Sequence, residues 1–284
     1  MANRPTLDFI KMHGLGNDFV VFDGRIEAVE LTSQEVRAIA DRRTGIGCDQ
    51  LITLKPSDKA DVFMTIQNAD GSQAEACGNA TRCIGAFIMA ENGEKTACIE
   101  TAVDMLKCEK VAGGIRANIG KPHLTWQQIP LAEERDTLNV GLDVGALKNP
   151  VAVNMGNPHV VYFVDEAEKI DLSGLGPMIE TYPLFPERVN VSVAQIISPN
   201  EIKLRVWERG AGITRACGTG AAASVVAGVR RGLIERQCKV QLLGGTLNIL
   251  WDESDHVLIS GAAETSYRGS VDLNTLINAG KENV

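Results

Sequence analysis

Hydrophobic and polar positions alternate over many short stretches of the chain, and this period of two predicts β-strands. Residues 188–193 and 201–207 are clear examples, with apolar side chains at every second position. Further strands are predicted at 8–22 (two strands joined by a turn at Asn17), 51–54, 61–67, 97–101, 105–111, 115–119, 151–154, 160–164, 238–243, 246–251 and 256–260. The chain is therefore expected to be rich in short strands.

Four stretches predict helices instead. Residues 33–42 and 171–181 suit helices, and Thr32 or Ser33 would cap the first of them. Two other helices, predicted at 79–90 and 218–229, are rich in small and apolar residues. The second is apolar on nearly every side, which predicts a helix buried all round.

Both apolar helices follow the same tripeptide, Ala-Cys-Gly, at Cys77 and Cys217. These cysteines are 140 positions apart, and several other residues recur with the same offset. The recurring pairs include Gly16-Asn17 with Gly156-Asn157, Val20-Val21 with Val160-Val161, Gln50 with Asn190, Asn68 with Glu208, and Cys98 with Cys238. One offset without gaps indicates an internal duplication.

The duplication predicts a mixed α/β chain of two pseudo-symmetric domains. Each would consist mostly of strands around one central buried helix, with an active site in the cleft between the domains. We place the first domain at 1–121, joined by the C-terminal segment 264–284, and the second at 122–263.

Composition narrows the functional class. The net charge of −8 and the lack of a basic cluster argue against a nucleic-acid partner. The N-terminus carries no apolar signal region, and no apolar run approaches membrane-spanning length. We expect a cytosolic protein that has no membrane partner.

The chain has seven cysteines, for which free thiols are the expectation in the cytosol. No Cys-x-x-Cys pair is present and the four histidines are scattered, so no metal site is expected. Most of the cysteines are expected to be small buried residues. Cys77 and Cys217 stand apart because they share the same sequence context.

A cysteine at a helix start meets unpaired backbone N–H groups and the positive end of the helix dipole, which favours the thiolate. Two such cysteines suit a reaction in which one thiolate removes a proton from carbon and the other thiol returns one to the opposite face. The pair must then hold one thiol and one thiolate together. The N–H groups of Gly78-Asn79 and Gly218-Thr219 would bind a substrate carboxylate.

Polar residues gather near these motifs in the repeat. Four asparagines at turns or strand ends, together with Arg209, form a set suited to a zwitterionic ligand. The asparagines are Asn17, Asn68, Asn157 and Asn190. His159 and Glu208 are the titratable residues near the cysteine motifs, and they are candidates for proton handling.

Other chemistries remain open from the residues alone. The two cysteines could form a redox pair, although redox dithiols are usually local in sequence. One cysteine could be a nucleophile with His159 as its base, which leaves the second cysteine unexplained. Both could also be buried structural residues in an amino-acid-binding protein without turnover.

The motifs themselves resemble the diaminopimelate epimerase family. The matching stretches are His13-Gly-Leu-Gly-Asn17-Asp-Phe, Gly45-Ile-Gly-Cys-Asp-Gln50, Asn68-Ala-Asp-Gly-Ser, Ala76-Cys-Gly-Asn79, Gly156-Asn-Pro-His159 and Glu208-Arg-Gly-Ala-Gly-Ile-Thr-Arg-Ala-Cys-Gly-Thr-Gly220. The chain departs from the family at Ala80, where glycine is usual, but this leaves the helix start unchanged.

The resemblance implies two domains, each a strand barrel around a central helix, and interconversion of LL- and meso-diaminopimelate without pyridoxal phosphate or metal. It implies that Cys77 and Cys217 are the acid–base pair, assisted by His159 and Glu208. The substrate-binding residues it implies are Asn17, Gln50, Asn68, Gly78, Asn79, Asn157, Asn190, Glu208, Arg209, Gly218 and Thr219. Members of the family are commonly homodimers. The nearest alternative is an enzyme resembling proline or hydroxyproline racemase.

Overall fold

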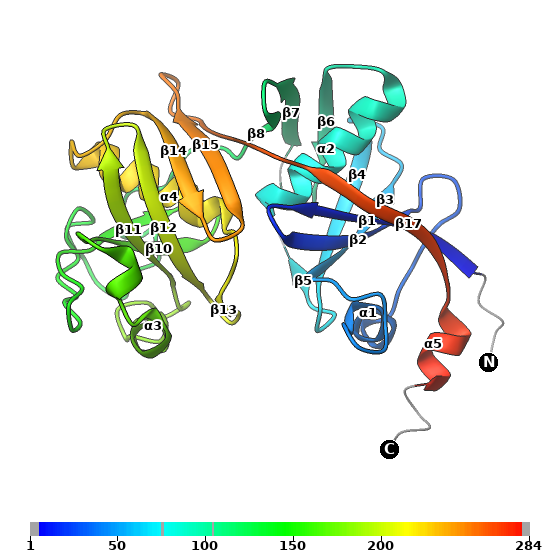
Figure 1. Ribbon diagram of the computed structural model, residues 1–284, viewed down its shortest axis with the longest axis horizontal. Helices are drawn as coiled ribbons and strands as arrows, with labels where there is room; N and C mark the ends of the chain where they lie inside the picture. Colours follow the sequence, from blue (N-terminus) through cyan, green and yellow to red (C-terminus); the bar gives the residue numbers. More distant parts are fainter. Residues whose placement is uncertain (1–5, 75–76, 104, 280–284) are drawn as a thin grey trace. The chain divides into compact units, whose positions relative to one another are not determined.

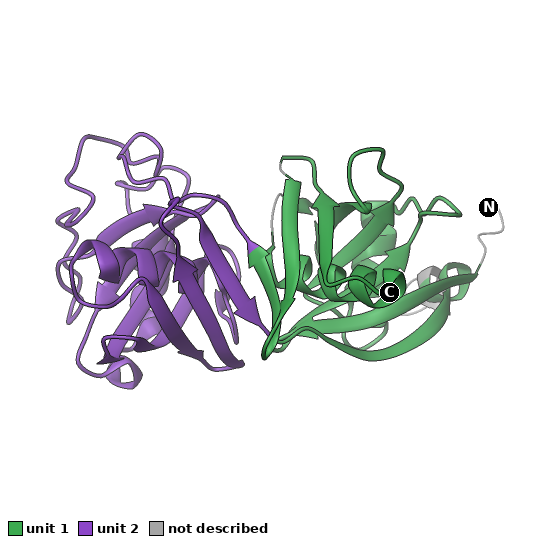
Figure 2. Ribbon diagram, turned by 90° about the horizontal axis from the view of Figure 1, so that it is seen from above, with its two compact units in different colours: residues 1–117, 262–284 green, residues 118–261 purple. Residues whose placement is uncertain are grey.

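The computed structural model describes residues 6–74, 77–103 and 105–279, and the chain divides into two compact units (Figure 2). Unit 1 combines Met1–Ala117 with Ala262–Val284, and unit 2 is the continuous segment Asn118–Gly261. Residues 75 and 76, which precede Cys77 in the first cysteine motif, lie outside the described part of the chain.

Unit 1 is built on a row of strands in the order β17–β1–β2–β3–β4–β6–β7–β8, with β5 beside β4 (Figure 1). The pairs β2–β3 and β4–β6 are parallel and the others antiparallel. The strands are β1 (Thr6–Gly14), β2 (Asn17–Asp23), β3 (Gln50–Lys55), β4 (Val62–Asn68), β5 (Gln73–Ala74), β6 (Thr96–Glu100), β7 (Met105–Val111), β8 (Gly114–Asn118) and β17 (Glu264–Asp272).

Unit 2 repeats this arrangement in the order β9–β10–β11–β12–β14–β15–β16, with β13 beside β12. The parallel pairs are β10–β11 and β12–β14, which take the places of β2–β3 and β4–β6 in unit 1, and the other pairs are antiparallel. The strands are β9 (Val151–Asn154), β10 (Pro158–Phe163), β11 (Asn190–Ser198), β12 (Glu201–Glu208), β13 (Gly212–Ile213), β14 (Gln237–Leu242), β15 (Gly245–Trp251) and β16 (Val257–Gly261). The matching strand order and directions confirm the predicted pseudo-symmetry.

One helix occupies the centre of each unit. Helix α2 (Gly78–Asn92) packs on β1, β6 and β7, and α4 (Gly218–Arg230) packs on β9, β10, β11 and β15. All but one of the residues from Gly218 to Gly228 are buried, which confirms the prediction of a helix surrounded by protein. Gly93 and Gly232 follow these helices with φ of 72° and 68°, a conformation that glycine adopts without strain.

The remaining helices are shorter than α2 and α4. Helix α1 (Ser33–Ala40) begins with a capping box, in which Thr32 and Glu35 satisfy each other's backbone N–H groups. It ends two residues before the predicted Arg42, because Asp41 is extended and its carboxylate accepts the N–H groups of Arg43 and Thr44. The others are the 3₁₀ helix η1 (Ala167–Lys169), α3 (Leu172–Glu180) and α5 (Leu273–Ala279).

Strand β17 and helix α5 are elements that the hydrophobic pattern did not predict. The side chains of β17 are mostly exposed on both faces, so the strand shows no alternation of buried and exposed positions. It is held by its antiparallel pairing with β1, from Thr6 with Asp272 to His13 with Glu264. This pairing returns the C-terminal segment to unit 1 (Figure 2).

Candidate active site

Cys77 is the N-cap residue of α2, as the sequence predicts for a cysteine at the start of the helix. Its backbone is extended, with φ of −149° and ψ of 106°, and its carbonyl accepts the N–H of Thr81 at 2.9 Å. The thiol is half-buried and donates to the Asn17 side-chain oxygen, with Sγ and Oδ1 3.7 Å apart. Cys77 therefore lies where the first turn of α2 meets the start of β2.

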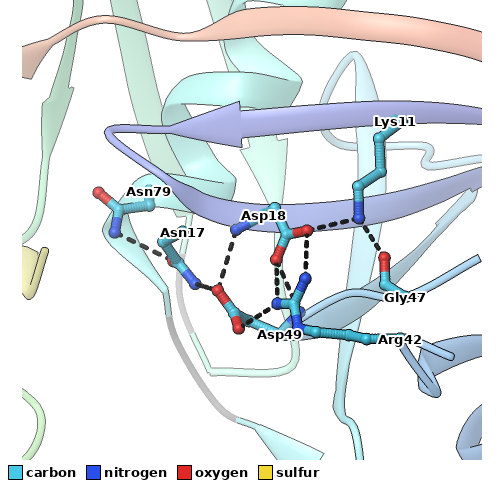
Figure 3. A network of polar contacts seen from close by, with 7 residues as sticks. All are labelled: Lys11, Asn17, Asp18, Arg42, Gly47, Asp49 and Asn79. Atoms are coloured by element: carbon cyan, nitrogen blue, oxygen red, sulfur yellow. Dashed lines mark hydrogen bonds and ion pairs between the residues drawn. The ribbon is translucent and has the colours of Figure 1, made fainter. Parts of the chain in front are cut away.

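The amide of Asn17 is oriented by its other contacts (Figure 3). Its Nδ2 donates to Asp49 Oδ2 at 2.9 Å, and its Oδ1 accepts from Asn79 Nδ2 at 3.0 Å. Because the nitrogen is directed at the carboxylate, the oxygen faces α2 and the thiol. Two of the predicted site residues, Asn17 and Asn79, are thus in direct contact.

A network of charges continues from Asp49 (Figure 3). Arg42 bridges the carboxylates of Asp18 and Asp49 at 2.6 Å each, and Lys11 Nζ lies 2.6 Å from Asp18 Oδ2. Lys11 also donates to the carbonyl of Gly47. Burial acts to raise the pKa of Asp18, but hydrogen bonds and charge from Arg42 and Lys11 outweigh it and lower this pKa to about 2. The network therefore holds Asp18 ionised behind Asn17.

Gln50 and Asn68 form a second contact in unit 1. They are cross-strand neighbours of β3 and β4, and Gln50 Nε2 donates to Asn68 Oδ1 at 3.0 Å. The parallel strands β2 and β3 begin at Asn17 and Gln50, so these residues lie at the same edge of the unit 1 strands. Asn68 Nδ2 donates to Ser72 Oγ at 3.0 Å.

Cys217 occupies the equivalent N-cap position of α4, which confirms the second predicted helix start. The residue is 4% exposed; the N–H of Gly220 donates to Sγ at 3.3 Å, and Thr219 Oγ1 lies 3.6 Å from Sγ. Burial and the negative charge of Glu208 raise the pKa of Cys217 well above its usual value, against the lowering effect of Thr219 and Gly220.

The prediction that a helix start favours the thiolate is therefore wrong for Cys217 in this structure. The helix N-terminus does act in the predicted direction, through the Gly220 N–H. Burial and the Glu208 carboxylate have a stronger, opposite effect on the pKa of Cys217, so Cys217 is a neutral thiol at neutral pH.

Strand β12 ends at Glu208, and Arg209 starts the turn that follows it. Glu208 accepts a hydrogen bond from the hydroxyl of Thr214. The backbone N–H of Arg209 donates to Asn190 Oδ1 at 3.0 Å, while its exposed guanidinium donates to the carbonyl of Glu187 at 2.7 Å. The structure thus brings Glu208, Arg209 and Asn190 together at the ends of β11 and β12.

His159 lies on β10 and is completely buried. Its Nε2 is 2.8 Å from Asn157 Oδ1, and its Nδ1 has no partner among the described residues. Burial, with a smaller contribution from Arg209, lowers the pKa of His159 to about 3. The imidazole is therefore neutral at physiological pH. Next to it in register, Asn190 donates from Nδ2 to the carbonyl of Pro158 at 2.9 Å.

Two residues of this region were missed by the sequence reasoning. Arg82 is fully buried in α2 and donates to Asn79 Oδ1 at 2.7 Å, and Asp49 orients Asn17. A single arginine inside an otherwise apolar helix was the available signal for the first. Asp49 gave no comparable signal, because an acidic residue in a glycine-bearing loop is common on protein surfaces.

Two classes of feature are not found in the described residues. Within 6–74, 77–103 and 105–279, no group of three His, Cys, Asp or Glu residues is arranged to hold a metal ion. The helices in the same part of the chain include none that is both long and apolar enough to cross a membrane.

Comparison with known sequences gives a consistent result. The sequence model of the family described as diaminopimelate epimerase matches residues 9–125 and 151–268. The chain is 52% identical over 272 residues to a diaminopimelate epimerase of Sphingopyxis alaskensis, covering 96% of this chain and 98% of that protein. It is 51% identical over 267 residues to that of Erythrobacter litoralis, covering 94% and 97%.

Solved structures with the same fold are much more distant in sequence. A hydroxyproline epimerase from Agrobacterium vitis superposes with a TM-score of 0.66 at 14% identity, covering 95% of this chain and 94% of that one. A phenazine biosynthesis protein of the PhzF family from Bacillus anthracis gives 0.66 at 16% identity, covering 94% and 99%. These likenesses describe the fold, whereas the sequence matches place the chain in the diaminopimelate epimerase family of isomerases.

Proposed function

We propose that this protein interconverts LL-2,6-diaminopimelate and meso-diaminopimelate, a step in the synthesis of lysine and of peptidoglycan precursors. The observation that carries the proposal is the equivalent placement of Cys77 and Cys217, each of which is the N-cap of the central helix of its unit. The relatives named diaminopimelate epimerase, at 51% and 52% identity, support it. A duplicated domain supplies two similar acid–base groups, and inversion of a stereocentre requires two.

The proposed reaction moves one proton off carbon and another onto it. One cysteine, as thiolate, removes the α-proton and becomes a thiol, and the electron pair of the broken C–H bond delocalises into the substrate carboxylate. The other cysteine, as thiol, donates its proton to the opposite face of the α-carbon and becomes a thiolate. Protons balance over the cycle, and the two thiols exchange protonation states.

The helix starts would stabilise the charge that develops on the carboxylate. Backbone N–H groups in the first turn of a helix have no intrahelical acceptor and point toward its N-terminal end. We assign the carboxylate to the first-turn N–H groups of Gly78, Asn79, Gly218 and Thr219. Donors fixed in place before the reaction cost little reorganisation when the negative charge grows.

The polar residues would hold the distal amino-acid end of the substrate and keep the site in shape. We assign this end to Asn17, Asn68, Asn157, Asn190 and Arg209, with Glu208 contributing and Gln50 lining the site. The amides of Asn17 and Asn190 already bond within their own units, which supports a role in fixing neighbouring groups as well. His159 would assist as a neutral imidazole that holds Asn157.

Further expectations follow from the family. We propose that the two units are copies of one duplicated domain, that the active protein is a homodimer in the cytosol, and that it needs no cofactor. Light scattering coupled to size-exclusion chromatography measures the oligomeric state, and a mass of one chain at micromolar concentration would contradict the dimer.

Exchange of the α-proton tests the proposed reaction. Purified, reduced protein is incubated in deuterated water with LL-diaminopimelate, with proline and hydroxyproline in parallel and no added cofactor. Deuterium at the α-carbon together with meso product, from diaminopimelate alone, is the expected result. Exchange with proline or hydroxyproline instead would favour a racemase of that type, and no exchange with any substrate would leave a redox or binding protein.

A further inference from the structure

Arg82 is a buried cation in the middle of unit 1. Its side chain is 0% exposed, and it is the largest of the fully buried side chains in the described residues. Burying a guanidinium costs free energy unless an anion or a full set of hydrogen bonds compensates for the lost water. The groups that surround Arg82 therefore indicate which residue its positive charge can stabilise.

Within the described residues, the hydrogen-bond partners of Arg82 are neutral groups. Nη2 donates to Asn79 Oδ1 at 2.7 Å and Nη1 to the carbonyl of Gly78 at 3.2 Å, while Nε has no partner among the described residues. A Cβ atom at Gly14 would lie 3.1 Å from Nη2, so β1 closes over the guanidinium without room for a further side chain.

Burial lowers the pKa of Arg82, and the titratable groups that act on it in the opposite direction, within the part of the chain that the structure describes, are the thiols of Cys83, Cys77 and Cys108. Burial raises the pKa of Cys83 and of Cys108 to about 12, so both stay neutral at physiological pH. Glu264 of β17 influences Cys83, but it is exposed and lies 3.7 Å from His13. Of the three thiols, Cys77 is the half-buried one, so it is the thiol whose ionisation we expect the Arg82 charge to affect.

Arg82 contacts Gly78 and Asn79, the two residues that follow Cys77 in the chain. It binds the carbonyl of Gly78, and it fixes the oxygen of the Asn79 amide so that Nδ2 faces Asn17 at 3.0 Å. The Asn17 oxygen that receives this bond is also the acceptor for the Cys77 thiol. The guanidinium therefore supports the N-terminal turn of α2 from inside the unit.

The internal repeat allows the charge of Arg82 to be compared with the equivalent position in unit 2. With the offset of 140 positions, Arg82 corresponds to Ala222 and Asn68 corresponds to Glu208. Unit 1 has a buried cation in its central helix and a neutral amide at the end of β4. Unit 2 has a neutral alanine in the helix and a carboxylate at the end of β12, so at these two pairs of equivalent positions unit 1 carries a positive charge and unit 2 a negative one.

We propose that Arg82 is a positioning residue for Cys77: it fixes Gly78 and Asn79, and its charge favours the thiolate of Cys77 while Cys217, beside Glu208, holds the proton. Cys77 then begins the cycle as the base. This inference rests on the proposed function for the catalytic role of the two thiols, but the charge effect itself does not depend on the identity of the substrate.

The rate at which each cysteine reacts with iodoacetamide tests the proposal, because only the thiolate reacts. Peptide-resolved mass spectrometry follows Cys77 and Cys217 separately from pH 5 to 10, without substrate. Arg82→Gln removes the charge and keeps a hydrogen-bond donor, whereas Arg82→Lys keeps the charge. Arg230→Gln is the matched control, since Arg230 is a half-buried cation of α4 that binds Ala152 and Thr137.

In Arg82→Gln we expect the midpoint of Cys77 alkylation to move up by about one pH unit, which slows the reaction about tenfold at pH 7. Arg82→Lys should restore most of the loss, and Arg230→Gln should leave Cys77 unchanged. An unchanged Cys77 profile in folded Arg82→Gln overturns the proposal. So does equal slowing by Arg82→Lys, which would mean that the guanidinium shape matters and the charge does not.

The wild-type protein supplies a second measurement that needs no variant to fold. The midpoint for Cys77 must lie below that for Cys217, and the opposite order overturns the proposal. Turnover of diaminopimelate is measured separately, and Arg82→Gln should lower kcat with little change in KM. If the alkylation results hold but no diaminopimelate is converted, the proposed function fails and the electrostatic role of Arg82 stands.

Discussion

Cys217 caps its own helix, since the backbone N–H of Gly220 donates to its Sγ at 3.3 Å. Cys77 holds the same N-cap position in α2, but its thiol donates to the side chain of Asn17. The two cysteines are equivalent by the sequence repeat and differ in hydrogen bonding, exposure and neighbouring charge.

Replacing either cysteine should stop epimerisation. We expect Cys77→Ala and Cys217→Ala each to lower the rate by a factor on the order of 10² to 10⁴, because each removes one of two required proton carriers. Unfolding free energies should fall by only ~1 kcal/mol. Cys238→Ala is the control, because Cys238 is a buried thiol on β14 that the proposed reaction does not use. Substantial epimerisation by either variant would contradict the two-base proposal.

Glu208 should control the protonation of Cys217. Burial raises the pKa of Cys217 and the Glu208 carboxylate raises it further, so Glu208→Gln should move the midpoint of Cys217 alkylation to lower pH. Glu201→Gln serves as the matched control, because Glu201 lies on the same strand and acts on Cys238 instead. An unshifted Cys217 profile in Glu208→Gln would show that burial alone sets its protonation.

The imidazole of His159 should remain neutral from pH 9 down to pH 4.5. Burial and Arg209 lower its pKa to about 3, against about 6.5 for an unfolded histidine. The fold therefore favours the neutral ring, and this stability is present above pH 6.5 and lost as pH falls toward 3. Ring-proton NMR should show one of the four histidines constant between pH 9 and 4.5 and absent in His159→Gln. A titration of that signal near pH 6.5 would be inconsistent with the buried state.

Sequence patterns predicted the elements whose exposure alternates or whose composition is extreme. Strand β12 alternates regularly between buried and partly exposed positions, and α4 is apolar on nearly every side, so the sequence pattern predicted both. The sequence also alternates over 188–193, where β11 begins, although the first five residues of β11 are all buried in the structure. Strand β17 was not predicted, because its stability comes from backbone pairing with β1 and its side chains are largely exposed.

The site was predictable to the extent that it depends on local chain position. A cysteine before a helix is a local feature, and both N-caps were predicted correctly. The protonation of Cys217 was not, because it depends on burial and on Glu208, which is nine positions earlier in sequence. The contact of Arg82 with Asn79 is local, but its complete burial depends on packing against β1 and β7.

The Asp18 network should make the protein sensitive to acid. Arg42 and Lys11 outweigh the effect of burial and lower the pKa of Asp18 to about 2 from 3.8. The ionised carboxylate thus contributes stability above pH 4, on the order of 2 kcal/mol, and this is lost as pH falls toward 2. Urea unfolding at pH 7 and pH 3 should show that Asp18→Asn lacks this dependence. The exposed Asp58→Asn is the control, and equal acid sensitivity in both variants would count against the network.

Oxidation should inactivate the protein reversibly by linking Cys77 to Cys217. The proposed reaction requires both sulfur atoms to approach one carbon, and thiols that can do so are candidates for a disulfide. Mass spectrometry of the non-reduced, air-oxidised protein should identify the cross-linked peptides, and a reductant should restore activity. Inactive protein in which both thiols remain free would sink this prediction.

The return of β17 to β1 also determines when each unit can be finished during translation. The N-terminal part of unit 1 leaves the ribosome before unit 2, but β17, which pairs with β1, leaves only after all of unit 2 has been made. Unit 2 is continuous in sequence and has its complete set of strands earlier. The half that is synthesised first is therefore completed last, and a ribosome that stops early leaves β1 with an open edge available to other chains.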